Sequence, residues 1–221
     1  RLFTALYHPE DFFVFHFDRR AGRELHALGR ELMSTYPNVA TLRPQVVLWG
    51  GPQLTSVQID AMRTALGSGR SWDYFVNLTG QDFPIKSRAA ILARLGETPG
   101  ASHVSYFDPL TTDHWGNARE RLARYYLYWP WLERLFAVRG LGRKLKALLG
   151  TTNRTPCIPW FYRRPPTFRY YGGANHVVLS AGACRYLVSD PAAERIVNWL
   201  KPAANSDEIV FQSVLLNSPL A

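Results

Sequence analysis

The sequence predicts an α/β fold with a mostly parallel central sheet flanked by helices in three layers. Two observations support this class. Short apolar runs typical of buried strands alternate with segments of helical periodicity over the first hundred residues, which favours parallel strands covered by helices on both faces. The 221 residues are 47% hydrophobic and 14% aromatic, which is enough apolar material for the core of one large domain.

The first strands and helices follow from local periodicity. Residues 1–6 indicate the end of a helix, and the alternating apolar run from Phe12 to Phe17 predicts the first strand. A helix is expected over about 21–35. A second strand is expected from Gln45 to Trp49, and Gly50-Gly51-Pro52 ends it.

The next segments continue the alternation. Apolar side chains at helical spacing predict a helix over 56–66, and Trp72 to Leu78 predicts a third strand. A helix is expected over 88–95, and a further strand from Ser102 to Phe107.

Residues 111–170 interrupt this pattern. The part from 113 to 149 is basic and aromatic, and it predicts a helix pair or another helical excursion. The part from 151 to 169 is rich in Pro and Arg, and it predicts a loop. We therefore expect an excursion within a single domain that spans 1–221.

The C-terminal part returns to strands and helices. A strand is expected over 175–179, a helix over 181–188 and a last helix over about 207–216. Ser206 is expected to cap that helix, with two carboxylates at its positive end. Both chain ends resemble interrupted helices, so we expect the chain to be the body of a longer protein, truncated at both ends.

Composition limits the partners and the compartment. The net charge of +9 suits an anionic partner, either nucleic acid, acidic lipid head groups or a diphosphate. Two cysteines, Cys157 and Cys184, are too few for a disulfide framework, which favours a reducing compartment, although one bridge between them stays open. The apolar runs are too short to cross a bilayer. We expect a cytoplasmic protein, with peripheral contact at the inner face of the membrane as an open option.

Several common motifs are missing from the sequence. It has no Gly-x-Gly-x-x-Gly after a strand, no phosphate loop, no Gly-x-Ser-x-Gly elbow and no His-Glu-x-x-His, which disfavours dehydrogenase, P-loop, esterase and zinc protease functions. No Asp-x-Asp pair follows a strand, and the six histidines are scattered. We therefore expect no metal site and no cofactor.

Polar residues follow three of the predicted strands. In open parallel sheets, the ligand crevice lies outside the carboxyl ends of the strands. The candidate binding residues at these ends are Asp18, Gly50, Thr79, Gln81 and Asp82. Two alternatives stay open, since Asp18 could cap the following helix and Asp82 could hold a tight turn with Pro84.

Five segments carry a resemblance to a known family. They are "ALYHPEDFFVFHFDRR", "VLWGGPQLTSVQIDAMRTAL", "WDYFVNLTGQDFPIKS", "GGANHVVLSAGACRYLV" and "SDEIVFQSVLLNSP". In order and approximate spacing they resemble the core-2/I-branching glycosyltransferases, which are related to the peptide O-xylosyltransferases. The resemblance covers nearly the whole chain apart from 111–170, and Asn-Leu-x-Gly-x-Asp-Phe-Pro is its most specific motif. The low cysteine content resembles a bacterial-type member.

The resemblance implies a GT-A type fold and transfer of a sugar from a UDP-sugar to an acceptor hydroxyl. It further implies inversion, a β-linkage and no metal. The family's Ser-Pro-Asp-Glu motif matches Ser206-Asp207-Glu208, with Asn205-Ser206 in place of Ser-Pro. Glu208 is thus the expected general base, because an inverting displacement needs a carboxylate to take the acceptor proton. The alternative is that Asp207 and Glu208 only favour a helix N-terminus.

Other family positions give expected substrate contacts. Asp18 matches a nucleoside contact, and Thr79, Gln81 and Asp82 match the turn beside the donor. The expected acceptor contacts are Asn175, Arg119, Arg121 and Asp207. The family's diphosphate-binding arginine and lysine are expected beyond residue 221.

The alternatives concern the donor and the class of function. The xylosyltransferase branch carries an aspartate where this chain has Asn175, which cannot act as a base, so GlcNAc or a related sugar is favoured over xylose. The acceptor is expected to be a glycan, a lipid-linked molecule or a peptide. A second class is a non-catalytic basic module that binds a membrane or, less favoured, nucleic acid through the basic aromatic segment.

Overall fold

The computed structural model describes the whole chain except residues 113–114, 130, 132–143, 145–148 and 153–154. The N-terminal half contains α1 (Leu2–Leu6), β1 (Phe13–Phe15), α2 (Arg23–Thr35), β2 (Val39–Thr41), α3 (Pro52–Leu66), β3 (Tyr74–Val76) and α4 (Arg88–Gly96). The C-terminal half contains α5 (Ala118–Ala123), β4 (Arg124–Tyr126), β5 (Gly150–Thr152), β6 (Thr155–Tyr162), β7 (Val178–Ser180), α8 (Ala181–Ser189), α9 (Pro191–Leu200), the 3-10 turn η1 (Ser206–Glu208) and α10 (Val210–Leu216).

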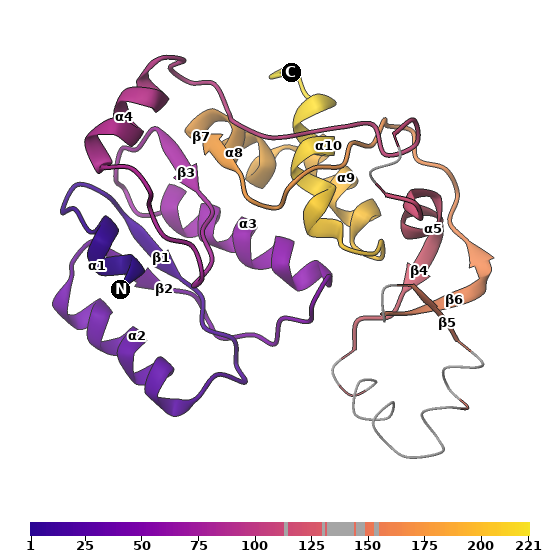
Figure 1. Cartoon of the computed structure of the whole chain (residues 1–221), viewed down its shortest axis with the longest axis horizontal. Coiled ribbons are helices and arrows are strands. Elements are labelled where there is room, and N and C mark those ends of the chain that lie inside the picture. The colour runs from indigo at the N-terminus through magenta and orange to yellow at the C-terminus, as the bar shows by residue number, and fades with distance from the viewer. Residues whose placement is uncertain (113–114, 130, 132–143, 145–148, 153–154) are drawn as a thin grey trace.

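The molecule is arranged from end to end in three parts (Figure 1). Helices α1 and α2 with strands β1 and β2 lie at one end, and β4, β5 and β6 lie at the other. Helix α3 and the C-terminal helices lie between them. The predicted excursion over 111–170 thus supplies α5 and the small sheet at the far end.

The described strands form three small sheets. β1 pairs in parallel with β2, β3 pairs antiparallel with β7, and β6 lies between β4 and β5, antiparallel to both. The α/β class is confirmed, but a mostly parallel sheet is wrong for these pairings. β7 reaches β3 after a long excursion and not through a strand–helix–strand crossover, so the connection does not impose a parallel direction. The three-layer arrangement stays a prediction.

The segment from Gln45 to Trp49, predicted as a strand, is extended but forms no strand ladder. The Gln45 carbonyl accepts from Arg19 N–H at 3.0 Å. The Val47 N–H donates to Asp18 Oδ2 at 2.9 Å, and its carbonyl accepts from the Arg20 guanidinium at 2.6 Å. Side chains therefore take the place of a neighbouring strand, which periodicity alone does not reveal.

Three other elements differ from the predictions. Residues 102–107 form only two isolated bridges, His103 with Val178 and Phe107 with Gly172. The predicted loop over 151–169 contains most of β5 and all of β6. Pro159 fits within β6 because the register against β4 shifts there: Arg124 pairs with Tyr162 and Tyr126 with Cys157, so Pro159 lies in a bulged stretch of β6.

Helix α9 lies outside the predicted set, although its start signal is present. The Asp190 side chain accepts from Ala192 N–H at 2.7 Å, and Pro191 occupies the first helical position. The last helix is also divided, since η1 precedes α10. Ser206 is fully buried in η1 and makes no capping hydrogen bond, so the predicted serine cap is wrong.

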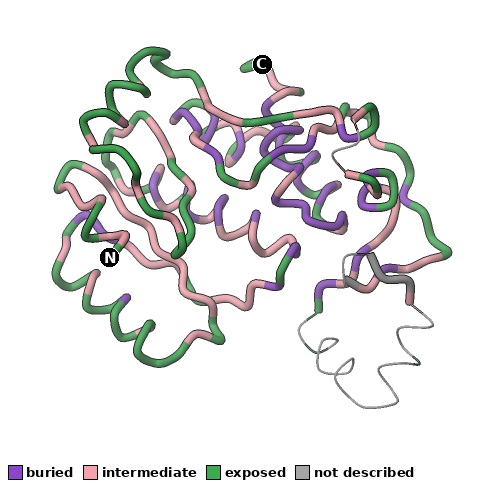
Figure 2. Tube along the Cα trace, viewed as in Figure 1, coloured by how far each residue is buried: buried purple, intermediate pink, exposed green. Residues whose placement is uncertain are grey.

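The main hydrophobic core lies between α3, α8, α9, α10 and β7 (Figure 2). Met62, Leu179 and Phe211 are fully buried there. The segment from Ala203 to Asp207, just before α10, is buried as well. Cys184 belongs to this core, whereas Cys157 lies in a smaller cluster, and no disulfide joins them.

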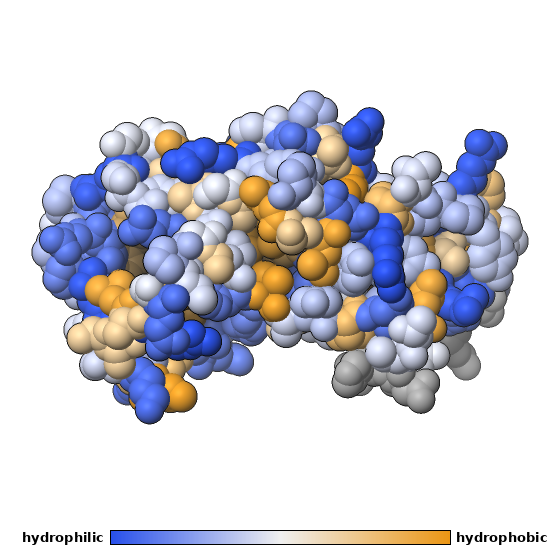
Figure 3. Space-filling model, turned by 90° about the horizontal axis from the view of Figure 1, so that it is seen from above, coloured by the Kyte–Doolittle hydropathy of each residue, from blue (hydrophilic) through white to orange (hydrophobic). Residues whose placement is uncertain are grey.

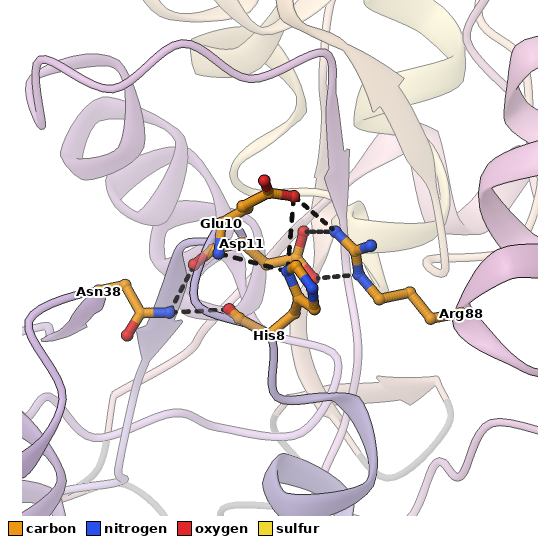
Figure 4. A network of polar contacts seen from close by, with 5 residues as sticks. All are labelled: His8, Glu10, Asp11, Asn38 and Arg88. Atoms are coloured by element: carbon orange, nitrogen blue, oxygen red, sulfur yellow. Dashed lines mark hydrogen bonds and ion pairs between the residues drawn. The ribbon is translucent and has the colours of Figure 1, made fainter.

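A polar network ties α4 to the N-terminal segment (Figure 4). The buried Asn38 donates to the carbonyls of His8 and Asp11, at 3.0 Å and 2.7 Å. Arg88, the first residue of α4, donates two bonds to the Asp11 carboxylate, at 3.0 Å and 2.9 Å, and lies 3.9 Å from Glu10. The network fixes the start of α4 and so the exit of the 77–87 segment.

The surface shows no extended apolar band on the face drawn in Figure 3. Apolar side chains gather near the middle of that face, and both ends are mainly hydrophilic. None of the helices in the described part of the chain is both long enough and apolar enough to cross a bilayer.

Candidate active site

A pocket of about 520 Å³ opens where three distant chain segments meet. Its volume suits a small-molecule ligand. The lining residues are Trp49, Gly50, Leu54, Thr79, Gly80, Gln81, Asn175, Asn205, Asp207 and Glu208. Six of the ten predicted site residues are in this set, namely Gly50, Thr79, Gln81, Asn175, Asp207 and Glu208.

The wall that carries the two carboxylates is held by backbone hydrogen bonds from three directions. Ala204 N–H donates to the Arg121 carbonyl at 3.1 Å, and Asn205 N–H donates to the Gly50 carbonyl at 3.0 Å. The Glu208 carbonyl accepts from Gly173 N–H at 2.9 Å. We call residues 204–208 the carboxylate wall. Its position is set by contacts far apart in sequence.

Gly50 must be a glycine for two reasons. Its φ of 67° lies in the left-handed region. A Cβ there would lie 2.8 Å from Asn205 Oδ1, which is too close. Asn205 is itself left-handed, with a φ of 51°, a conformation that asparagine tolerates better than most residues. The two residues thus form a tight junction in the pocket.

Glu208 is half-exposed and paired with a buried cation. Its Oε2 accepts from the Arg121 guanidinium at 2.9 Å. The Glu208 side chain is 32% exposed and that of Arg121 only 11%. The Arg121 guanidinium also lies over the Trp115 ring, 4.4 Å from its centroid. The carboxylate is therefore fixed in direction while it remains open to the pocket.

Asp207 is the buried member of the carboxylate pair. It is 4% exposed, and its Oδ2 accepts from Asn175 Nδ2 at 3.2 Å. Desolvation, followed by the charge of Glu208, raises the pKa of Asp207 to about 6, although the Asn175 bond and the Arg121 charge act in the opposite direction. The second oxygen of the carboxylate, Oδ1, receives no hydrogen bond from the described residues. The site therefore carries two carboxylates in different environments.

Another part of the pocket lining comes from an exposed turn, residues 79–82, which we call the 79–82 turn. The Asp82 carboxylate accepts from Thr79 N–H, which is the chief cause that lowers the Asp82 pKa. Thr79 Oγ1 accepts from Gln81 N–H at 3.3 Å, and His176 lies 3.4 Å from Asp82. Asp82 does not line the pocket. Its contacts agree with the alternative that it holds the turn.

Three predicted binding residues other than Asp82 also lie outside the pocket lining. Asp18 is engaged by Arg20 and Val47. Desolvation raises its pKa, but these hydrogen bonds and the Arg20 charge outweigh it and lower the pKa. Arg119 is exposed, and Arg121 reaches the site through Glu208.

Four lining residues were outside the predicted set: Trp49, Leu54, Gly80 and Asn205. Trp49 is 69% exposed, next to the buried Leu48, because the chain turns at Gly50. The signal available in the sequence was a large aromatic residue directly before a Gly-Gly pair. For Asn205 the signal was an asparagine in the place of the serine of the matching Ser-Pro-Asp-Glu motif.

Metal ligation has no candidate in the part of the chain that the structure describes. No group of three or more His, Cys, Asp or Glu side chains is arranged there to hold an ion.

Comparisons with known proteins show which sequences this chain is similar to. The family model described as Core-2/I-Branching enzyme matches residues 1–220. An N-acetyllactosaminide β-1,6-N-acetylglucosaminyl-transferase of Mus musculus is 24% identical over 209 residues, which is 94% of this chain and 47% of that protein. Xylosyltransferase oxt of Drosophila melanogaster is 34% identical over 105 residues, which is 47% of this chain and 12% of that protein. The chain thus spans less than half the length of these curated relatives.

Proposed function

The chain belongs to the Core-2/I-branching enzyme family, and we propose that it is a glycosyltransferase with Glu208 as its general base. The proposed reaction moves N-acetylglucosamine or a related sugar from a UDP-sugar to an acceptor hydroxyl. It proceeds with inversion, forms a β-linkage and uses no metal. The observation that carries the proposal is the Glu208 carboxylate, open to the pocket on one side and bonded to Arg121 on the other.

The proposed chemistry is a single displacement. The acceptor hydroxyl oxygen attacks the anomeric carbon as the bond from that carbon to the diphosphate oxygen breaks, and UDP leaves with the bonding electrons. The hydroxyl proton passes to Glu208. A partly exposed carboxylate suits this step, since it can meet the hydroxyl while Arg121 holds its other side.

The two walls suggest how the substrates are divided. We assign the donor to the exposed side, at Gly50, Thr79 and Gln81, and the acceptor hydroxyl to the side of Asn175 and Asp207. Asp18 and Asp82 support the donor side indirectly, by holding Val47 and the 79–82 turn. A nucleoside contact of Asp18 and an acceptor contact of Arg119 stay predictions.

A xylosyl donor is the second candidate. It is favoured by the identity of 34% to the Drosophila xylosyltransferase, which is higher than the identity to the acetylglucosaminyl relative, although over a shorter stretch. Asn175 disfavours a xylosyl donor. The resemblance implies that the xylosyltransferase branch has an aspartate at this position, and an asparagine cannot take its place as a base. A cytoplasmic enzyme, with or without peripheral membrane contact, is part of the proposal.

The test is a panel of UDP-sugars incubated with the full-length protein and candidate acceptors, with UDP release as the readout. We expect one donor to be turned over. Glu208→Gln should lower kcat by about 10²- to 10⁴-fold, because the amide cannot take the proton. Glu120→Gln is the matched control, since Glu120 is 52% exposed on α5 and pairs with Arg124 outside the pocket. Full activity of Glu208→Gln would overturn the proposed mechanism.

A further inference from the structure

Arg121 has a role that differs from the acceptor contact the sequence predicts. We propose that Arg121 is a positioning residue, which fixes the direction of the Glu208 carboxylate. This inference rests on the proposed function of Glu208. It comes from the ion pair at 2.9 Å, the burial of the arginine and the ring of Trp115 behind it.

Helix α5 is bonded to the carboxylate wall at two points, both through Arg121. The Arg121 carbonyl accepts from Ala204 N–H at 3.1 Å. The Arg121 guanidinium donates at 2.9 Å to the carboxylate of Glu208, which lies four residues after Ala204 in the chain. The backbone bond sets the distance between α5 and the wall, and the side-chain bond sets the rotamer of Glu208. An excursion that interrupts the predicted α/β pattern thus supplies a part of the site.

The electrostatic setting favours the same role. Asp207 and Glu208 are adjacent acids in one turn, and the charge of Glu208 helps to raise the pKa of Asp207. In the described part of the chain, Arg121 is the cation paired with Glu208. The Trp115 ring covers its other face, so the pair is screened less by water than a surface pair would be.

The residue that follows α5 offers a matched control. Arg124, the first residue of β4, is also poorly exposed, lies over the Tyr162 ring at 5.2 Å and pairs with Glu120 at 3.4 Å. Its guanidinium also donates to the Pro159 carbonyl at 2.8 Å, and neither of these partners lines the pocket. Loss of Arg124 therefore reports what a poorly exposed, paired arginine of this segment contributes to folding alone.

The experiment measures kcat and the acceptor KM of the full-length protein with the donor identified above. Arg121→Met should lower kcat by on the order of 100-fold and leave the acceptor KM within about threefold, because a misplaced base slows the chemical step. The kcat of Arg121→Lys should be about tenfold higher than that of Arg121→Met, since lysine keeps the charge but not the planar guanidinium. Arg124→Met should keep the parent kcat. Added guanidinium should restore part of the rate of Arg121→Ala.

A double-mutant cycle shows whether Arg121 acts through Glu208. We expect Arg121→Met to slow the Glu208→Gln variant no further, because the group it positions is gone. A raised acceptor KM with parent kcat, an additive loss in the double variant, or an equal loss in Arg124→Met would overturn the inference. Should Arg121→Met fail to fold, Arg121→Lys takes its place. If the Tm of Arg121→Lys equals that of the parent, a lowered kcat supports the inference and a parent kcat overturns it. A Glu208→Gln variant as fast as the parent would instead overturn the proposed function itself.

Discussion

The two walls of the pocket are held in different ways. The carboxylate wall is buried, continues into the fully buried part of α10 and receives backbone hydrogen bonds from three distant segments. The 79–82 turn is exposed and is held mainly by Asp82 and Thr79, two of its own residues. The proposed base thus lies on a buried segment, whose displacement would break many contacts. The 79–82 turn is exposed and can adjust more easily.

The largest expected effect concerns the cost of the buried wall. Asp207→Asn should raise the free energy of unfolding at pH 8, by up to about 3 kcal/mol for a two-unit shift. Because its folded pKa of about 6 lies above the ordinary value, the native state binds the extra proton, and the carboxylate destabilises the protein as pH rises through that range. The gain should vanish below about pH 4.

Urea unfolding at pH 4 and pH 8 measures this effect. Asp60→Asn is the control, since Asp60 forms an exposed pair with Arg63, and it should change stability by no more than about 0.5 kcal/mol at either pH. A loss of stability at pH 8 in Asp207→Asn would show that the buried carboxylate supports the wall and does not strain it.

The next effect concerns the junction between the walls. Gly50→Ala should lower the free energy of unfolding by about 1–3 kcal/mol, through left-handed strain and the clash with Asn205. It should also lower kcat, because the wall that carries Glu208 must shift. Gly69→Ala is the matched control, with a φ of 73° and open space around the added Cβ.

Thermal unfolding and UDP release separate the two contributions at Gly50. Gly69→Ala should show the strain without any change in kcat. Equal effects of the two substitutions on Tm and kcat would mean that the junction does not position the site.

The smallest effect is expected in the 79–82 turn. Asp82→Ala removes the acceptor for Thr79 N–H and should cost about 1 kcal/mol of stability. We expect the KM for the UDP-sugar to rise several-fold with little change in kcat, because the turn loosens while the base stays in place. A kcat loss comparable to that of Glu208→Gln would contradict the difference between the walls.

Local elements could be predicted where the signal is local. Helices α2, α4 and α8 and strands β1, β3 and β7 occur where periodicity places them. Strand β2 was not anticipated, because Val39–Thr41 is a short run after Pro37-Asn38 with no alternation of its own. The segment from Gln45 to Trp49 has the composition of a strand, but its partners are the side chains of residues 18 and 20.

The site residues divide in the same way. Glu208, Asp207 and Asn175 could be selected from the sequence because they match motifs of the family, and all three line the pocket. The role of Arg121 could not, since its partner lies 87 residues away. Asp18 was predicted to contact the nucleoside of the donor; in the structure it accepts from Val47 N–H and is not part of the pocket lining.

By itself the sequence determined the family, the α/β class and the residue types available for chemistry, because motif spacing and hydrophobic periodicity are properties of neighbouring residues. The tertiary structure decided which of those residues meet. The pairing of Arg121 with Glu208, the junction of Gly50 with Asn205 and the burial of Asp207 all depend on segments that approach only when the core around α10 is packed. Burial sets the pKa of Asp207, and a long-range contact sets the direction of the Glu208 carboxylate. Neither can be read from a local pattern in the sequence.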